Sequence, residues 1–342
     1  MRRIHALALV GGTVLMAGCG EQPSTAPAEP ASSVTAVPAI TPSAAFSEFA
    51  SPGDHVHLHP TRANYERANA KPGGGGGGGG NTGISYHGGP VIVSPKVVAI
   101  YWASASIYNG GPAVNTTGTG AQDGSVIGGF LRSLGGSPYW NINATYFNGS
   151  NVHVNNSLTY TGFWATNHNA PASGSAPNDA AMQALINFGF SSGAISYDAS
   201  TIYEIFTASG VNLGGGFGSS YCAYHGHFSS SVGDVKYAAE PYNWQFPSAC
   251  AALNGSPNND PAADAEVNTI AHETEEFTTD PDLNAWFDRR GEENADKCAW
   301  TFGTTFTSNG ATANMTLSNG KSYLVQRNWI NSGSGGCRQS NP

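Results

Sequence analysis

The chain has 342 residues, of which 39% are hydrophobic and 11% charged, and its formal net charge is −9 at pH 7. This length and hydrophobic content are sufficient for one substantial core. An acidic chain with only 14 lysines and arginines lacks the basic surface that attracts phosphate backbones, so its composition argues against nucleic-acid binding. Its glycine-rich runs lack the lysine of a phosphate-binding loop, which argues against nucleotide binding as well.

Residues 1–18 have the form of a lipoprotein-type signal peptide. Arg2 and Arg3 precede a mostly apolar run over residues 4–17, which is shorter than the roughly 20 residues of a membrane-spanning helix. The small residues before Cys19 resemble a bacterial lipobox, in which the cysteine is lipidated. We therefore expect export and attachment of Cys19 to the outer face of a bacterial membrane. The alternative is ordinary cleavage nearby, with Cys19 incidental.

Residues 19–83 have the composition of a disordered tether. They are rich in proline, alanine and serine and end in consecutive glycines at residues 73–80. Such a segment buries too little apolar surface to offset its ordering entropy. It contains "HVHLH", with His55, His57 and His59. These histidines could chelate a metal ion, but the composition of the segment favours a disordered tract in which they are incidental.

Residues 84–342 are predicted to form a single folded domain. Residues 97–102 and 200–210 are β-branched and aromatic and predict strands, whereas residues 125–134 and 178–190 have helical spacing. Strands that alternate with helices predict an α/β or α+β fold, with a mixed β-sheet flanked by helices.

A longer helix is predicted over residues 260–280, and it is rich in charged residues. Asp260 can cap its first turn, Pro261 suits the first helical position, and Pro281 disfavours helix beyond Asp280. At about 100° per residue its apolar side chains form one face, and "HETEE" at residues 272–276 lies on another.

The spacing in "HETEE" is that of a metal-binding helix. In H-E-x-x-H enzymes the first and fifth residues bind zinc and the glutamate after the first histidine polarises the attacking water. Here His272 and Glu276 take the ligand positions, and Glu273 takes the position of the general base. These residues predict a zinc-dependent, peptidase-like hydrolase with a zincin-like helix.

A histidine and one glutamate cannot hold catalytic zinc alone, so a further ligand must come from elsewhere in the chain. The segment "YCAYHGHF" offers two imidazoles, and the segment after the helix offers four carboxylates. The candidates in these segments are His225, His227, Asp280, Asp288, Glu293 and Asp296.

Two other interpretations of this helix stay open. The face that carries His272 and Glu276 is also where solvated charges normally lie on an amphipathic helix. The carboxylates of residues 273–296 are dense enough to bind a structural Ca²⁺ ion outside the cell. A serine hydrolase is disfavoured, because the "GFSSG" at residues 189–193 follows a helix and precedes a strand, the reverse of a nucleophile elbow.

Four cysteines remain beyond Cys19, and an even number in an exported protein predicts two disulfides. Because pairing between sequence neighbours closes the shortest loops, we favour Cys222–Cys250 and Cys298–Cys337. A zinc site built from all four cysteines is disfavoured, since no C-x-x-C pair is present.

Several separated motifs resemble one known family. They are "YHGGPVI", "VVAIYWA", "GGFLRSLGGSPYW", "YCAYHGHF", "CAW" and "YLVQRNWI", which run from Tyr86 to the segment before Cys337. In this order they resemble the phosphate-induced protein 1 family, also called EXORDIUM-like. The resemblance implies an extracellular or wall-associated protein without an assigned reaction.

The resemblance does not extend to "HETEE", so the metal prediction depends on the residues of this chain alone. The sequence thus leads to two expectations. The first is an exported, lipid-anchored zinc hydrolase acting on a peptide. The second is a non-catalytic protein that binds a cell-wall polymer or a partner outside the cell, with Ca²⁺ as its structural ion.

Overall fold

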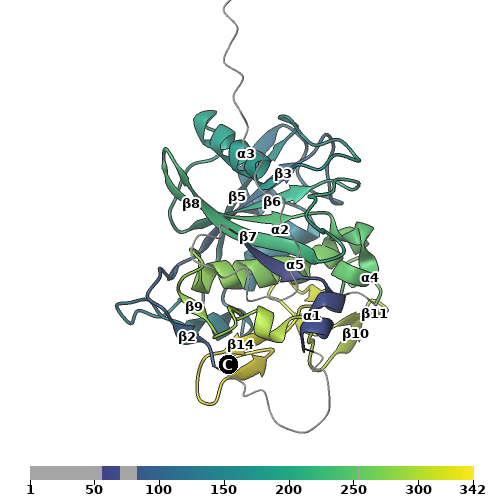
Figure 1. Ribbon diagram of the computed structural model, residues 1–342. Helices are drawn as coiled ribbons and strands as arrows, with labels where there is room; N and C mark the ends of the chain where they lie inside the picture. The colour runs from purple at the N-terminus through teal and green to yellow at the C-terminus, as the bar shows by residue number, and fades with distance from the viewer. Residues whose placement is uncertain (1–55, 70–82, 253) are drawn as a thin grey trace, which may run out of the picture. The chain divides into compact units, whose positions relative to one another are not determined.

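The computed structural model describes residues 56–69, 83–252 and 254–342 (Figure 1). Its main feature is a mixed seven-stranded sheet with the order β1-β7-β8-β6-β3-β5-β4. The neighbours among β8, β6, β3 and β5 run parallel, whereas β7 is antiparallel to β8, β1 to β7 and β4 to β5. The strands of this sheet are β1 (Val56–Pro60), β3 (Lys96–Trp102), β4 (Thr116–Thr119), β5 (Thr159–Thr166), β6 (Thr201–Thr207), β7 (Tyr221–Ser230) and β8 (Gly233–Glu240).

The remaining elements are helices and short two-stranded sheets. The α-helices are α1 (Arg62–Asn69), α2 (Val126–Leu134), α3 (Asp179–Ser191), α4 (Pro247–Cys250) and α5 (Pro261–Thr279). The 3-10 helices are η2 (Gly120–Gln122), η3 (Trp140–Thr145), η4 (Asn243–Gln245) and η5 (Asp296–Cys298). The short sheets pair β2 (Ser85–Tyr86) with β9 (Trp286–Phe287), β10 (Phe306–Ser308) with β11 (Ala311–Ala313), β12 (Met315–Thr316) with β13 (Ser322–Tyr323), and β14 (Asn328–Ile330) with β15 (Gly336–Arg338).

The sheet separates two apolar cores. Side chains alternate between the faces of a strand, so in β3 Val97 and Ala99 pack with α2 and α5, whereas Ile100 and Trp102 pack with α3 on the other face. In Figure 1, α3 lies above the sheet and α5 below it. The predicted mixed sheet flanked by helices is confirmed.

Helix α5 lies within the domain and is buried on all sides. The carboxylate of Asp260 accepts a hydrogen bond from the amide of Ala263, and Pro261 occupies the first turn, as predicted. All its residues from Ala262 to Thr279 are buried, including its histidine and glutamates. The interpretation of "HETEE" as a solvated face is therefore wrong, because the β7 edge, β1 and the C-terminal segments cover that face.

Residues 56–69 are ordered, which corrects the prediction that residues 19–83 form a disordered tether. Leu58 packs into the apolar core on the α3 side of the sheet, whereas His57 and His59 are buried on the α5 side. The histidines are therefore not incidental: the backbone of β1 pairs with β7, which composition alone does not reveal. The expected signal peptide, Cys19, His55 and residues 70–82 of the expected tether lie outside the described residues.

Both favoured disulfides are confirmed: Cys222 pairs with Cys250, and Cys298 pairs with Cys337. The first joins β7 to α4, and the second joins η5 to β15. In the part of the chain that the structure covers, no helix is both long and apolar enough to cross a bilayer.

A buried carboxyl beneath α5 generates a prediction about stability. Glu204 of β6 is fully buried, and burial raises its pKa from about 4.5 to about 8 although the hydroxyl of Thr274 donates to it. Between these pH values the folded state keeps a proton that the unfolded state has lost, so this group lowers the free energy of unfolding as pH rises. We expect Glu204→Gln to raise the free energy of unfolding at pH 8 by roughly 2–4 kcal/mol and to leave it unchanged at pH 4.5.

Urea unfolding at the two pH values measures this effect. The matched control is Glu66→Gln on the exposed surface of α1, which should change neither value. An equal effect of Glu204→Gln at both pH values would contradict the assignment.

Candidate functional site

Four segments bring histidines and carboxylates together on the α5 side of the sheet. We call this the histidine–carboxylate cluster, and all its members are buried. Strand β1 contributes two imidazoles and β7 one, α5 contributes an imidazole and two carboxylates, and the segment at η5 contributes two carboxylates. The cluster consists of His57, His59, His225, His272, Glu273, Glu276, Glu293 and Asp296.

His57 and His225 lie directly opposite each other on β1 and β7. His57 Nε2 lies 2.6 Å from Asp296 Oδ2, and His225 Nδ1 lies 2.9 Å from Glu273 Oε2. Where the two carboxylates are ionised, these nitrogens are the donors, because an ionised carboxylate only accepts. The other nitrogens, His57 Nδ1 and His225 Nε2, lack hydrogen-bond partners and lie 3.5 and 3.8 Å from Glu293 Oε1.

His272 has a different arrangement, which is set by the side-chain amide of Gln326. The amide oxygen accepts from the amide of Trp300, and the amide nitrogen donates to the carbonyl of Ala295 at 2.8 Å, so its orientation is fixed. The same nitrogen lies 3.0 Å from His272 Nδ1 and must donate to it. The ring proton therefore lies on Nε2, which is 3.0 Å from Glu276 Oε2.

Glu276 lies at the centre of the cluster. Its Oε1 accepts the backbone N–H of Asp296 at 2.9 Å, which orients the carboxylate. Its Oε2 faces His272 Nε2 at 3.0 Å, His225 Nδ1 at 3.7 Å and His57 Nε2 at 3.9 Å. The predicted alignment of residues 272 and 276 by one helical turn is therefore present as a close ion-pair contact, although neither His272 Nε2 nor Glu276 Oε2 has a hydrogen-bond partner.

The electrostatics of the cluster follow from burial and from the fact that its carboxylates pair with histidines. The ion pairs of its carboxylates that involve described residues are all with histidines, not with lysine or arginine. Burial raises the pKa of Glu273 and of Glu293 well above the ordinary value. Although burial opposes it, Asp296 raises the pKa of His57 to about 9, and His57 and His272 in turn hold the pKa of Asp296 below its ordinary value.

His59 completes the cluster by ring stacking. Its ring lies parallel to that of His272, with centroids 3.8 Å apart, and next to that of Trp300. Burial, followed by His272, lowers the pKa of His59 well below its ordinary value. The ring is therefore neutral near neutral pH, and both of its nitrogens lack hydrogen-bond partners.

Three of the predicted metal ligands lie outside the cluster. His227 contacts Asp234 at 3.0 Å and forms a separate, partly exposed group with Asp234 and Asp282. Asp280 Oδ1 accepts the backbone N–H groups of residues 284 and 285 at the end of α5. Asp288 accepts from Lys297 at 3.0 Å and from backbone amides of its own loop.

Sequence reasoning missed His57 and His59, which the structure places in the cluster. A signal for them was present, because "HVHLH" alternates apolar and polar residues with the period of a half-buried strand. Glu293 and Asp296 were among the offered carboxylates, but nothing in their spacing separated them from Asp288.

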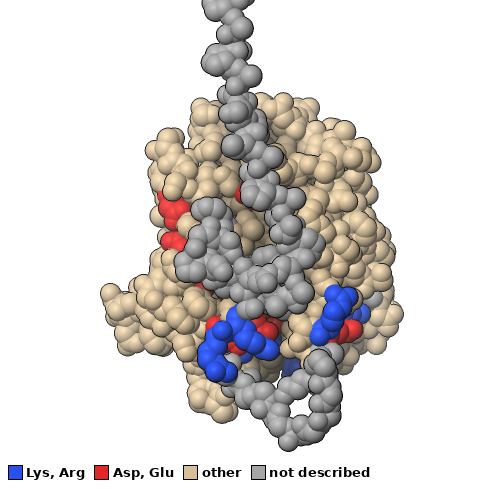
Figure 2. All heavy atoms as spheres, in the orientation of Figure 1, with Lys and Arg blue, Asp and Glu red and all other residues tan. Residues whose placement is uncertain are grey.

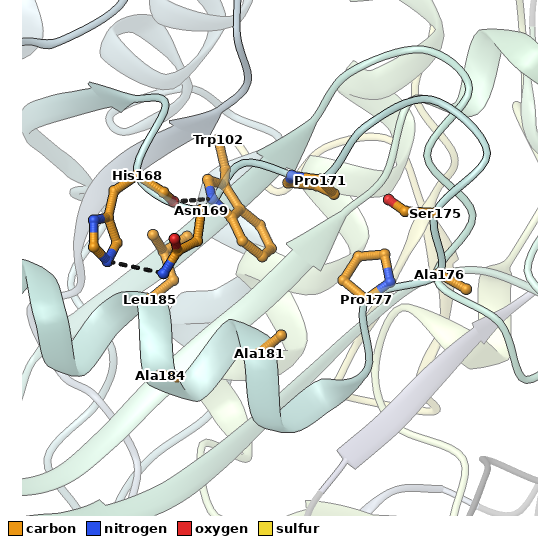
Figure 3. Close-up of a pocket in the computed structure, with 10 residues that line it drawn as sticks. All are labelled: Trp102, His168, Asn169, Pro171, Ser175, Ala176, Pro177, Ala181, Ala184 and Leu185. Atoms are coloured by element: carbon orange, nitrogen blue, oxygen red, sulfur yellow. Dashed lines mark hydrogen bonds between the residues drawn. The ribbon is translucent and has the colours of Figure 1, made fainter. Parts of the chain in front are cut away.

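The surface has few charged residues on the face in Figure 2, where Lys, Arg, Asp and Glu cover only small areas of the described part. A separate depression of about 420 Å³ lies on the α3 side of the sheet, on the opposite face from the cluster (Figure 3). Its walls are mostly apolar, and in Figure 3 the ring of Trp102 faces them while its Nε1 donates to the carbonyl of His168. The residues that line it are Trp102, His168, Asn169, Pro171, Ser175, Ala176, Pro177, Ala181, Ala184 and Leu185.

The geometry at Gln326 predicts a defined protonation of His272. Glu276 and Asp296 outweigh burial and raise the pKa of this ring, but a proton on Nδ1 would face the amide N–H of Gln326. In chelator-treated protein at pH 8 we expect Nε2 to carry the proton and Nδ1 to carry none, as measured by long-range ¹H–¹⁵N correlation spectra. In Gln326→Met, which lacks the amide donor, both nitrogens should be protonated. Protonated Nδ1 in the unaltered protein would contradict the assignment.

Comparisons with known proteins identify one family. The family described as the phosphate-induced protein 1 conserved region matches residues 121–338. No curated protein and no solved structure matches the chain. The matched region contains the cluster residues of β7, α5 and η5, whereas β1 precedes it. Because the match covers more than half of the sequence, the chain belongs to the phosphate-induced protein 1 family.

Proposed function

We propose that the histidine–carboxylate cluster binds one divalent transition-metal ion, with zinc as the best fit. The ligands would be His57 Nδ1, His225 Nε2 and Glu293, with Glu276 as a further carboxylate. The observation that carries the proposal is that both free imidazole nitrogens face Glu293 while their partner nitrogens donate to Asp296 and Glu273. A histidine that binds a metal is normally held by such a second-shell carboxylate.

Unpaired atoms support the proposal. His57 Nδ1, His225 Nε2, Glu276 Oε2 and Glu293 Oε2 are all buried without a hydrogen-bond partner. Buried polar atoms are rarely left so, and a bound ion is one of the usual reasons. Neighbouring ligands on a tetrahedral zinc ion lie about 3.4 Å apart, close to the 3.5 and 3.8 Å between the free nitrogens and Glu293 Oε1.

The donor set also favours zinc over calcium. Ca²⁺ prefers oxygen ligands, whereas imidazole with carboxylate suits zinc and related transition metals. The carboxylates of the loop after α5 are partly neutralised already, since Asp288 pairs with Lys297 and Glu292 with Arg290. His272 is a supporting residue in this proposal, because its Nε2 lies 3.0 Å from Glu276 Oε2 while its Nδ1 is occupied by Gln326.

Metal analysis of the purified full chain tests the proposal. We expect one zinc per chain, and we expect His225→Ala and Glu276→Ala to lower zinc affinity by more than the roughly 10–100-fold that loss of a second-shell partner costs. His227→Ala is the matched control on the same strand and should keep its zinc. His272→Ala should weaken binding less than His225→Ala.

Each of these results can contradict the proposal. A folded protein without zinc would overturn the metal site. Equal zinc loss in the His227 and His225 variants would contradict the assignment of His225 as a ligand. A larger loss in His272→Ala than in His225→Ala would instead favour His272 as a direct ligand.

A zinc hydrolase is the finer function that this site supports. Zinc, when bound, lowers the pKa of a coordinated water towards about 7. Glu273 Oε2 accepts from His225, and its buried Oε1 lacks a hydrogen-bond partner and so is available to take a proton. We propose Glu273 as the general base and a peptide as the substrate. All members of the cluster are buried and β1 contributes two of them, so we propose that movement of this strand admits the substrate.

Glu273→Gln separates the chemical role from metal binding. We expect this variant to keep zinc and to lose peptide hydrolysis by about 100-fold or more in kcat/KM, because it removes a general base. Glu275→Gln is the matched control on the same helix, where Glu275 contacts Tyr139 and not the metal ligands. Equal activity of the Glu273 variant and the unaltered protein would exclude the base.

The two disulfides indicate an oxidising compartment. We further propose export and lipid attachment through Cys19 at the outer face of a bacterial membrane. The alternative to an enzyme is a non-catalytic protein that binds a cell-wall polymer outside the cell. The apolar depression beside Trp102 would be its binding surface.

A further inference from the structure

We infer that the edge of β7 that β1 covers is a binding site for an extended peptide, and that β1 is a built-in occupant which can be displaced. The inference deepens the proposed function by naming the substrate class, an extended peptide antiparallel to β7. It depends on that function only for the hydrolytic readout, since peptide binding can be measured without activity.

The pairing of β1 with β7 is of a kind that another peptide can reproduce. Strand β1 lies at the end of the sheet and pairs only with β7, through main-chain contacts from Val56 opposite Gly226 to Pro60 opposite Tyr221. Main-chain hydrogen bonds to a sheet edge do not depend on sequence, and pockets for alternate side chains supply the specificity.

The contacts of the β1 side chains show where those pockets lie. Leu58 enters the apolar core beside Tyr224, which is its cross-strand partner. On the opposite face, His57 reaches Asp296 and His59 stacks on His272. A peptide that replaces β1 would therefore place one apolar side chain in the Leu58 position and present its neighbours to Glu273 and Glu276.

The rest of the segment is held by partly buried side chains, of which Tyr65 packs against the buried cluster that contains Trp300 and the disulfide Cys222–Cys250. Helix α1 has no buried residue, and burial in residues 56–69 is confined to residues 57–61. Arg62 donates to the carbonyl of Ala251, and the hydroxyl of Tyr65 donates to the carbonyl of Lys297 at 3.4 Å. Segments with few buried contacts open at a lower free energy than the core.

The receiving edge is fixed independently of β1. The disulfide Cys222–Cys250 fastens the start of β7, whereas residues 56–69 contain no cysteine. On its other side β7 pairs with β8, from Tyr224 opposite Ala239 to Ser230 opposite Gly233. Departure of β1 would thus leave β7 in place and remove His57, which frees one position at the proposed metal site. A catalytic zinc site needs such an open position.

Cleavage between α1 and the rest of the chain tests the inference. The full chain is prepared with a site-specific protease sequence in place of part of the glycine run at residues 73–80, a change that removes no side chain. The probe is a fluorescent peptide of residues 54–69, and its matched control carries alanine at positions 57 and 59.

After cleavage we expect saturable binding of the probe, and before cleavage none. The alanine peptide should bind about tenfold more weakly or worse. Peptide hydrolysis should rise at least about tenfold on cleavage. Hydrogen exchange of the uncleaved chain should show β1 opening before β7 and β8.

The other outcomes are also decisive. A cleaved protein that stays folded and holds zinc but neither exchanges β1 nor binds the probe would overturn the inference and leave the metal site standing. Probe binding without zinc would support the peptide site and overturn the metal proposal. Exchange of β1 amides as slow as those of β8 would contradict displacement.

Discussion

The pairing of β1 with β7 is the contact on which the candidate site depends. It places His57 opposite His225 and brings both rings against the buried face of α5. Neither ring is held by its strand alone, because each donates to a carboxylate from another segment, Asp296 for one and Glu273 for the other. An antiparallel register, which puts directly opposed residues on the same face of a sheet, is what makes this convergence possible.

A helix as acidic as α5 is stable inside the domain because the surrounding groups compensate its charges. Glu276 accepts the amide of Asp296, Glu275 contacts Tyr139, and Glu266 accepts from Asn243. Burying an ionised carboxylate is costly unless it is paired or hydrogen-bonded, and in the cluster histidines provide that pairing. The protein thus maintains a high density of titratable groups where solvent is absent, as functional sites often do.

The sequence predicted the regular elements better than the site. Capping by Asp260, helical spacing over α5 and the β-branched run of β3 are local signals, and each element formed where they predicted it. The burial of "HETEE" was not local, since it arises from strands and loops far away in the sequence. β1 was missed for the same reason: a single amphipathic strand in a polar, proline-rich segment gains its stability only from the β7 edge. The tautomer of His272 depends on Gln326, more than fifty residues away, which no motif includes.

The closed cluster and a metal ion would stabilise each other. If His57 is a ligand, an ion bound there attaches β1 to the domain, and by linkage the attached strand increases affinity for the ion to the same extent. Without a metal, the same carboxylates can be neutralised only by protons, on groups such as His57, whose pKa is raised to about 9, and Glu293. Metal binding would then have to displace those protons. A lower pH would therefore weaken both the binding of the ion and the attachment of β1. If β1 supplies a ligand, it is more than a passive cover. The segment that covers the cluster would then also complete the metal site, and its removal would exchange a saturated centre for an open one.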